Sequence, residues 1–136
     1  MENKKRIKIY NGKIITPEKI IENGCIVLYD GIIVGIEQGN PEIANCVEYD
    51  ANGNYVAPGF IDIHTHGAGG SDFMDCTAED CLTIARTHMK HGTTLLYPTT
   101  LASDNKELFD FLDVYDKVKK QQEGASFGGL HLEGPY

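Results

Sequence analysis

The chain has 136 residues, which suits one ordinary domain, and 41% of them are hydrophobic, enough for a real core. Its 12 basic and 20 acidic residues give a formal net charge of -8, which argues against nucleic acid or an anionic membrane as a partner because both require basic patches. No apolar run approaches the roughly 20 residues of a membrane span, and no signal-peptide core is present. We therefore expect a cytoplasmic protein, and because the four cysteines show no C-x-x-C pairing, we expect them to be free buried thiols.

The first part of the chain, residues 1–57, predicts a small antiparallel β-sandwich segment. Asn11-Gly12 and Asp30-Gly31 are strong hairpin signals between apolar segments. The expected strands share an apolar, strand-type composition and run over 7–10, 13–16, 24–29, 32–36, 46–50 and 55–56. These residues contain no catalytic constellation, so we interpret the segment as a scaffold.

The second part, residues 58–136, alternates strands with helices. Its expected elements are a buried strand over 59–66, a helix over 78–91, a strand over 93–98, a helix over 104–122 and a strand over 127–133. This order predicts a parallel sheet. A complete (β/α)8 barrel takes about 250 residues. We therefore expect an α/β fold in which this part forms the first three βα units of an incomplete TIM-like barrel.

Local signals set the expected limits of the two helices. Thr77 and Asp80 resemble a capping box, Gly92 lies where a C-terminal cap belongs, and Ser103 is the expected N-cap of the second helix. The apolar face of the second helix follows helical spacing and consists of Leu108, Phe111, Leu112, Tyr115 and Val118.

The candidate chemistry lies at the carboxyl ends of the strands, where parallel α/β folds place their sites. His64 and His66 share one face because they are two positions apart on a strand. This pair alone is explained equally well by a metal or by two polar residues at a strand-to-loop junction. His131 and Glu133 repeat the spacing at a second strand end, and a carboxylate beside two imidazoles favours a divalent metal. The predicted ligands are Glu133, His64 and His66.

Four neighbouring residues remain open between two roles. Asp62 and His131 each lie one pleat deeper than a predicted ligand, where a stacked interior position or a second layer around the metal competes evenly with metal ligation. Gly69 and Gly70 could bind an anionic substrate through backbone N–H groups or form an ordinary turn.

Other chemistries find less support in the sequence. His88 and His91 lie three positions apart on the first helix and are expected to form a helix face rather than to bind metal. The Gly-rich loop 67–72 lacks the Gly-Lys-Ser/Thr ending of a nucleotide-binding loop. The sequence shows no Ser-His-Asp or Cys-His pattern of the kind used in nucleophilic catalysis. Metal-assisted hydrolysis is the chemistry that these residues fit.

The motifs together resemble the amidohydrolase superfamily and, within it, the N-acetylglucosamine-6-phosphate deacetylase family. The segments that carry the resemblance are 57–67 (Ala-Pro-Gly-Phe-Ile-Asp-x-His-x-His-Gly), 69–75, 91–100 and 129–136, which contains His-Leu-Glu-Gly-Pro. Dihydroorotase-like or hydantoinase-like activity is less favoured because Leu-Glu-Gly-Pro is not their pattern.

The resemblance implies a distorted (β/α)8 barrel that hydrolyses N-acetylglucosamine 6-phosphate to glucosamine 6-phosphate and acetate. It implies a divalent metal, Zn or Fe, with Glu133 matching the family's metal-binding glutamate. His64 and His66 match the pair found in members with two metal ions, so one or two ions are expected. The resemblance also implies a homodimer for the full-length protein.

The family's remaining metal histidines and its catalytic aspartate lie beyond the matching region. We therefore expect no catalytic residue in these 136 residues, and no activity from them alone. The alternatives are a deacetylase of another amino-sugar phosphate, such as N-acetylgalactosamine 6-phosphate, and a non-catalytic fragment that only self-associates.

Overall fold

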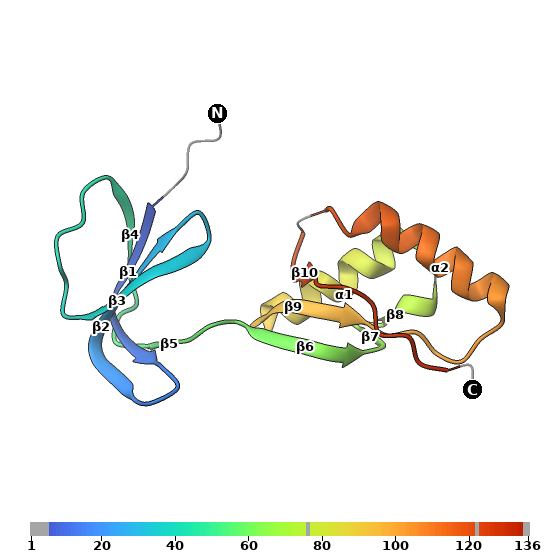
Figure 1. The fold of residues 1–136 in the computed structure, drawn as a ribbon, viewed down its shortest axis with the longest axis horizontal. Coiled ribbons are helices and arrows are strands. Elements are labelled where there is room, and N and C mark those ends of the chain that lie inside the picture. The colour runs from blue at the N-terminus through green and yellow to red at the C-terminus, as the bar shows by residue number, and fades with distance from the viewer. Residues whose placement is uncertain (1–5, 76, 122, 135–136) are drawn as a thin grey trace. The chain divides into compact units, whose positions relative to one another are not determined.

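The computed structural model describes residues 6–75, 77–121 and 123–134. The chain divides into two compact units, Met1–Pro58 and Gly59–Tyr136, each built on its own sheet (Figure 1). Within the described ranges, no helix is long and apolar enough to cross a membrane.

The first unit is a single five-stranded mixed sheet. Its strands are β1 (Arg6–Ile15), β2 (Ile20–Tyr29), β3 (Ile32–Gln38), β4 (Cys46–Asp50) and β5 (Tyr55–Val56). The order is β3-β2-β1-β4, with β5 also paired to β1. β2 is antiparallel to both β1 and β3, whereas β4 and β5 run parallel to β1. The prediction of a β-rich unit is confirmed, but the antiparallel sandwich is wrong, because the described strands form one mixed sheet.

Of the two predicted hairpin turns, the one at Asp30-Gly31 is present and the one at Asn11-Gly12 is not. Asp30 and Gly31 form the expected turn between β2 and β3, with φ of 55° and 78°, the positive values that a two-residue hairpin of this kind requires. Asn11 also has a positive φ, of 56°, but it lies inside β1, where the pairing with β2 shifts between Ile9 and Gly12. The predicted hairpin there is wrong: the pair forms a bulge in one long strand.

The second unit is a three-stranded parallel sheet with two helices. The strands are β6 (Phe60–Thr65), β9 (Thr93–Pro98) and β10 (Ser126–Phe127), in the order β10-β9-β6, and the helices are α1 (Ala78–Lys90) and α2 (Asn105–Val118). The predicted parallel sheet is thus confirmed. The third strand is much shorter than the expected 127–133, because after β10 only a single bridge, Thr99 to His131, continues the pairing.

A compact connection joins β6 to α1. It contains the short hairpin of β7 (Gly67–Ala68) and β8 (Ser71–Asp72), followed by a 3-10 turn, η1 (Phe73–Asp75). Gly69 and Gly70, with φ of 68° and 87°, form the two-residue turn of this hairpin. The glycine-rich loop is therefore an ordered turn that leads into the helix.

The N-caps show one prediction confirmed and one wrong. The Thr77 side chain accepts a hydrogen bond from the Asp80 N–H, as expected for the start of α1. For α2 the cap is Asp104, whose carboxylate accepts from the N–H of Glu107 at 2.9 Å, instead of Ser103. This helix ends at Val118, earlier than expected, because the residues that follow are polar and offer no buried face.

The core of the second unit lies between the sheet and the helices. It consists of Phe73, Cys81, Ile84, Leu96, Phe111, Val118 and Ala125. The predicted apolar face of α2 is confirmed, with Phe111 and Val118 fully buried. The expected burial of the first strand is wrong: Phe60, Ile61 and Ile63 are 67%, 61% and 68% exposed. They lie on β6, one of the two edge strands of the described three-stranded sheet.

Candidate metal centre

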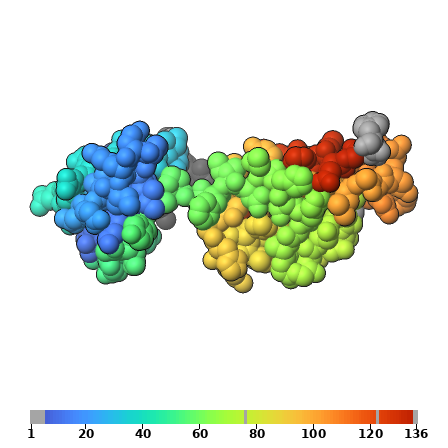
Figure 2. All heavy atoms as spheres, turned by 90° about the horizontal axis from the view of Figure 1, so that it is seen from below, coloured from blue at the N-terminus to red at the C-terminus, as the bar shows by residue number. Residues whose placement is uncertain are grey.

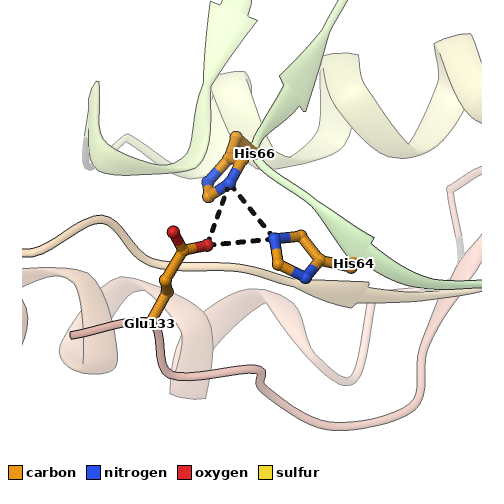
Figure 3. Close-up of side chains that lie close together, drawn as sticks. All are labelled: His64, His66 and Glu133. Carbon is orange, nitrogen blue, oxygen red and sulfur yellow. Dashed lines mark hydrogen bonds and ion pairs between the residues drawn. The ribbon is translucent and has the colours of Figure 1, made fainter.

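The three predicted ligands converge on one point (Figure 3). His64 Nε2 lies 3.3 Å from His66 Nε2 and 3.0 Å from the Oε2 atom of Glu133. His66 Nε2 lies 3.3 Å from the same Oε2 atom. Figure 2 shows the last described segment, which carries Glu133, in red beside residues of the β6 region in green. Residues almost 70 positions apart in sequence thus meet at the strand ends.

These spacings fit a metal ion. In a tetrahedral site with bonds of about 2.0–2.1 Å, the ligand atoms lie roughly 3.3 Å apart, which matches the three observed distances. A hydrogen bond in which one Nε2–H donates to the other ring is a second explanation for the contact between the two histidines. A cation between the three atoms accounts for all of the contacts.

The alternation of β6 directs both histidines to this point. Thr65, between them, is buried and turned toward α1, where its Oγ1 atom lies 3.3 Å from His88 Nε2. Because neighbouring side chains leave a strand on opposite faces, His64 and His66 project to the other side. The side chains of His64, His66 and Glu133 are 46%, 34% and 48% exposed.

Asp62 and His131 both contact the segment that carries His64. The Asp62 carboxylate accepts a hydrogen bond from the backbone N–H of His64 at 3.1 Å. The ring of His131 packs on that of His64, with centroids 4.4 Å apart, and His131 Nδ1 lies 3.2 Å from the carbonyl oxygen of Ile63. These contacts suit a second layer, and that role stays a prediction. His66 Nδ1 is buried and has no hydrogen-bond partner among the described residues.

The remaining candidates lie away from the cluster. His88, only 17% exposed, stands behind β6, with Nδ1 3.8 Å from an Asp62 oxygen, so it is more buried than a helix-surface residue would be. His91 is exposed, as expected. Gly69 packs against α1: a Cβ atom there would lie 2.5 Å from Thr87 Oγ1, whereas one on Gly70 would meet open space. A substrate role for the two glycines stays a prediction.

Two buried threonines were given no role by the sequence reasoning. Thr99 and Thr100 follow β9 and are 0% and 1% exposed. Their hydroxyl groups accept hydrogen bonds from the backbone N–H groups of Thr65 and Glu133. The predicted strand over 93–98 put both residues just after a strand end, but only the strand pairing identifies these partners.

The curated relatives of this chain share one name, and several solved structures with a similar fold carry it too. The N-acetylglucosamine-6-phosphate deacetylase of Bacillus subtilis is 31% identical over 128 residues, which cover 90% of this chain and 32% of that protein. The crystal structure of N-acetylglucosamine-6-phosphate deacetylase from Pasteurella multocida superposes with a TM-score of 0.84 at 28% identity, covering 96% of this chain and 35% of that one. A D-hydantoinase structure, at 27% identity and 93% and 27% coverage, reaches 0.59.

No protein-family model matches the chain. The chain spans about a third of the length of the curated relatives that cover most of it. The solved deacetylase structures superpose better than the hydantoinases do. Over about nine-tenths of its length, this chain is homologous to the N-acetylglucosamine-6-phosphate deacetylases, hydrolases of the amidohydrolase superfamily.

Proposed function

We propose that the whole protein carrying this sequence is a metal-dependent hydrolase that removes the acetyl group from N-acetylglucosamine 6-phosphate, giving glucosamine 6-phosphate and acetate. The names of the relatives support the substrate and the reaction. Within this chain the proposal is carried by one observation: the Nε2 atoms of His64 and His66 and a carboxylate oxygen of Glu133 lie within 3.3 Å of one another.

Each residue of the site has a proposed task. A bound divalent metal, Zn or Fe as one or two ions, would supply a water of lowered pKa and polarise the acetamide carbonyl. His64 and His66 offer neutral imidazole nitrogens, and Glu133 offers a negative charge that offsets part of the ion's charge. Asp62 and His131 orient the His64 segment through the contacts described above.

For substrate binding we assign one turn of this chain, and for proton transfer we assign no residue. The turn at Gly69 and Gly70 follows directly on the metal histidines, and we place it next to the substrate. No residue of this chain is assigned to proton transfer, which the family resemblance puts beyond the matching region.

The surrounding architecture follows from the same proposal. The mixed sheet of 1–57 is a separate scaffold domain, and 58–136 contributes the first strands and helices of a (β/α)8 barrel. Support comes from the three parallel strands and from the three ligands, of which His64 and His66 lie at the carboxyl end of β6 and Glu133 lies in the segment that follows β10. We also propose that the enzyme is a cytoplasmic homodimer.

The test uses the purified whole protein and measures acetate released from N-acetylglucosamine 6-phosphate. We expect turnover that disappears when a chelator removes the metal and returns when Zn²⁺ or Fe²⁺ is added. N-acetylgalactosamine 6-phosphate in a parallel assay tests the choice of sugar. Absence of acetate release from the metal-loaded protein, or release that survives complete metal removal, would refute the proposal. The 136 residues alone should release no acetate.

A further inference from the structure

We infer that Thr99 and Thr100 are positioning residues that hold the two ligand-bearing segments at the separation needed for a metal ion. This inference rests on the proposed function and deepens it. Both side chains follow β9, the central strand of the sheet, and are 0% and 1% exposed. A buried hydroxyl is costly unless it is hydrogen-bonded, so their partners are informative.

Thr99 fastens the segment that carries both histidines. The pairing of β6 with β9 shifts between Asp62 and Thr65, and at this irregularity the Thr65 N–H donates to the Thr99 hydroxyl at 3.0 Å. The Thr65 carbonyl oxygen accepts from the Thr99 N–H at 2.9 Å. Thr65 is thus held on both sides of its Cα atom. Because it lies between His64 and His66, this double attachment fixes the directions in which they leave the chain.

Thr100 fastens the segment that carries the carboxylate. β10 ends at Phe127, and beyond the single bridge at His131 the Glu133 N–H donates to the Thr100 hydroxyl at 3.1 Å. The Thr100 N–H in turn donates to the His131 carbonyl oxygen at 3.1 Å. A side-chain hydroxyl therefore replaces the missing ladder contact at the residue that supplies the ligand.

The two threonines hold the β6 segment and the Glu133 segment to the same place, the end of β9. Two adjacent residues just after the central strand bond to different segments, Thr99 to β6 and Thr100 to Glu133. Removing the Thr99 hydroxyl leaves the buried N–H of Thr65 without its partner, and removing the Thr100 hydroxyl does the same to the part-buried N–H of Glu133. In each case one ligand segment loses a contact that holds it in place. Partners that orient metal ligands typically contribute 10- to 100-fold to metal affinity.

The test compares matched variants of the whole protein. Thr99→Val and Thr100→Val keep the shape and remove the hydroxyl, whereas Thr99→Ser and Thr100→Ser keep the hydroxyl. Thr93→Val, a buried threonine at the opposite end of β9, is the control. We would measure the Zn²⁺ dissociation constant by competition with a chromophoric chelator, the visible spectrum of the Co²⁺ form, and the Tm of the metal-free protein.

We expect each valine variant to bind Zn²⁺ about 10- to 100-fold more weakly and to show an altered Co²⁺ spectrum. The serine variants should recover most of the affinity, and Thr93→Val should retain it. Valine variants that lose only Tm while binding Zn²⁺ normally would overturn the inference, as would serine variants that fail to recover. Failure of the wild-type protein to bind metal would instead refute the proposed function, before any variant is made.

A measurement on the wild-type protein covers the case of a valine variant that does not fold. If the hydroxyl bonds and the metal site are coupled, Zn²⁺ must slow hydrogen exchange at the amides of Thr65 and Glu133. Equal exchange rates with and without Zn²⁺ at these two amides would overturn the inference.

Discussion

The Nε2 atoms of His64 and His66 lie 3.3 Å apart, although the two residues stand at the end of an edge strand. The i, i+2 spacing explains why both side chains lie on one face of the strand. It does not fix their χ angles, so the two imidazole rings could still point away from each other. Their convergence depends on neighbours. His131 packs on the ring of His64, and Thr65 is bonded on both sides to Thr99. The pair is therefore held by the sheet end as a whole.

Glu133→Gln tests the carboxylate ligand. The amide keeps the size of the side chain but removes the negative charge, so we expect Zn²⁺ affinity to fall by more than the 10- to 100-fold typical of losing an outer partner. Isothermal titration of the metal-free whole protein measures this. The matched control is Glu123→Gln, which changes a surface glutamate paired with Arg86. Similar Zn²⁺ affinities for the two variants would show that Glu133 is not a ligand.

Phe111→Ala tests the core beneath the site. Phe111 is fully buried, with its ring 6.2 Å from that of Phe73, so truncation should leave a cavity and lower the free energy of unfolding by about 3–5 kcal/mol. Urea denaturation followed by circular dichroism measures the loss. Phe109, on the same helix but 62% exposed, is the control, and its truncation should change stability by less than about 0.5 kcal/mol. Equal losses from both truncations would contradict the described packing of α2.

The parts of the site that the sequence could predict were those set by local spacing. Period-two patterns located His64, His66 and Glu133, and the capping pattern located Thr77 at the start of α1. Each depends on residues a few positions apart. By contrast, the Asn11 turn signal was overridden because β1 continues through it to pair with further strands.

What the sequence could not predict depends on long-range register. The partners of Thr99 and Thr100 follow from a one-residue shift in the pairing of β6 with β9 and from the early end of β10. The limited burial of β6 depends on which elements lie beside it, and no residue pattern within the strand encodes that. Ser103 and Asp104 are both good N-caps, and the packing of α2 decides between them.

Asp80 gives a prediction about acid stability. Hydrogen bonds from the hydroxyl groups of Thr77 and Ser71 hold the pKa of the Asp80 carboxyl below its usual value of 3.8. The ionised form therefore favours the native state. This contribution is fully present above the unfolded-state pKa, near 3.8, and is lost as the pH falls through the lower folded-state pKa.

Asp80→Asn should therefore cost stability at pH 6, and the difference from wild type should shrink toward pH 3. Urea denaturation at the two pH values measures the difference. Asp113→Asn, on the exposed side of α2, is the control. A difference that is the same at both pH values would mean that the hydrogen bonds to Asp80 do not depend on its charge.

Cys25 gives a prediction about thiol reactivity. Its side chain is fully buried in the first unit, and burial raises the pKa of the thiol above the ordinary 9.0. At pH 8 a smaller fraction of the Cys25 thiol is therefore thiolate, the form that reacts, and the reagent can reach it only when the sheet opens.

Cys46, at the start of β4, is only partly buried. We expect iodoacetamide to modify Cys46 well before Cys25 in the native protein, measured by mass spectrometry of the digested chain. In urea the two rates should converge, because unfolding removes the burial that separates them. Faster labelling of Cys25 under native conditions would contradict its full burial in the first unit.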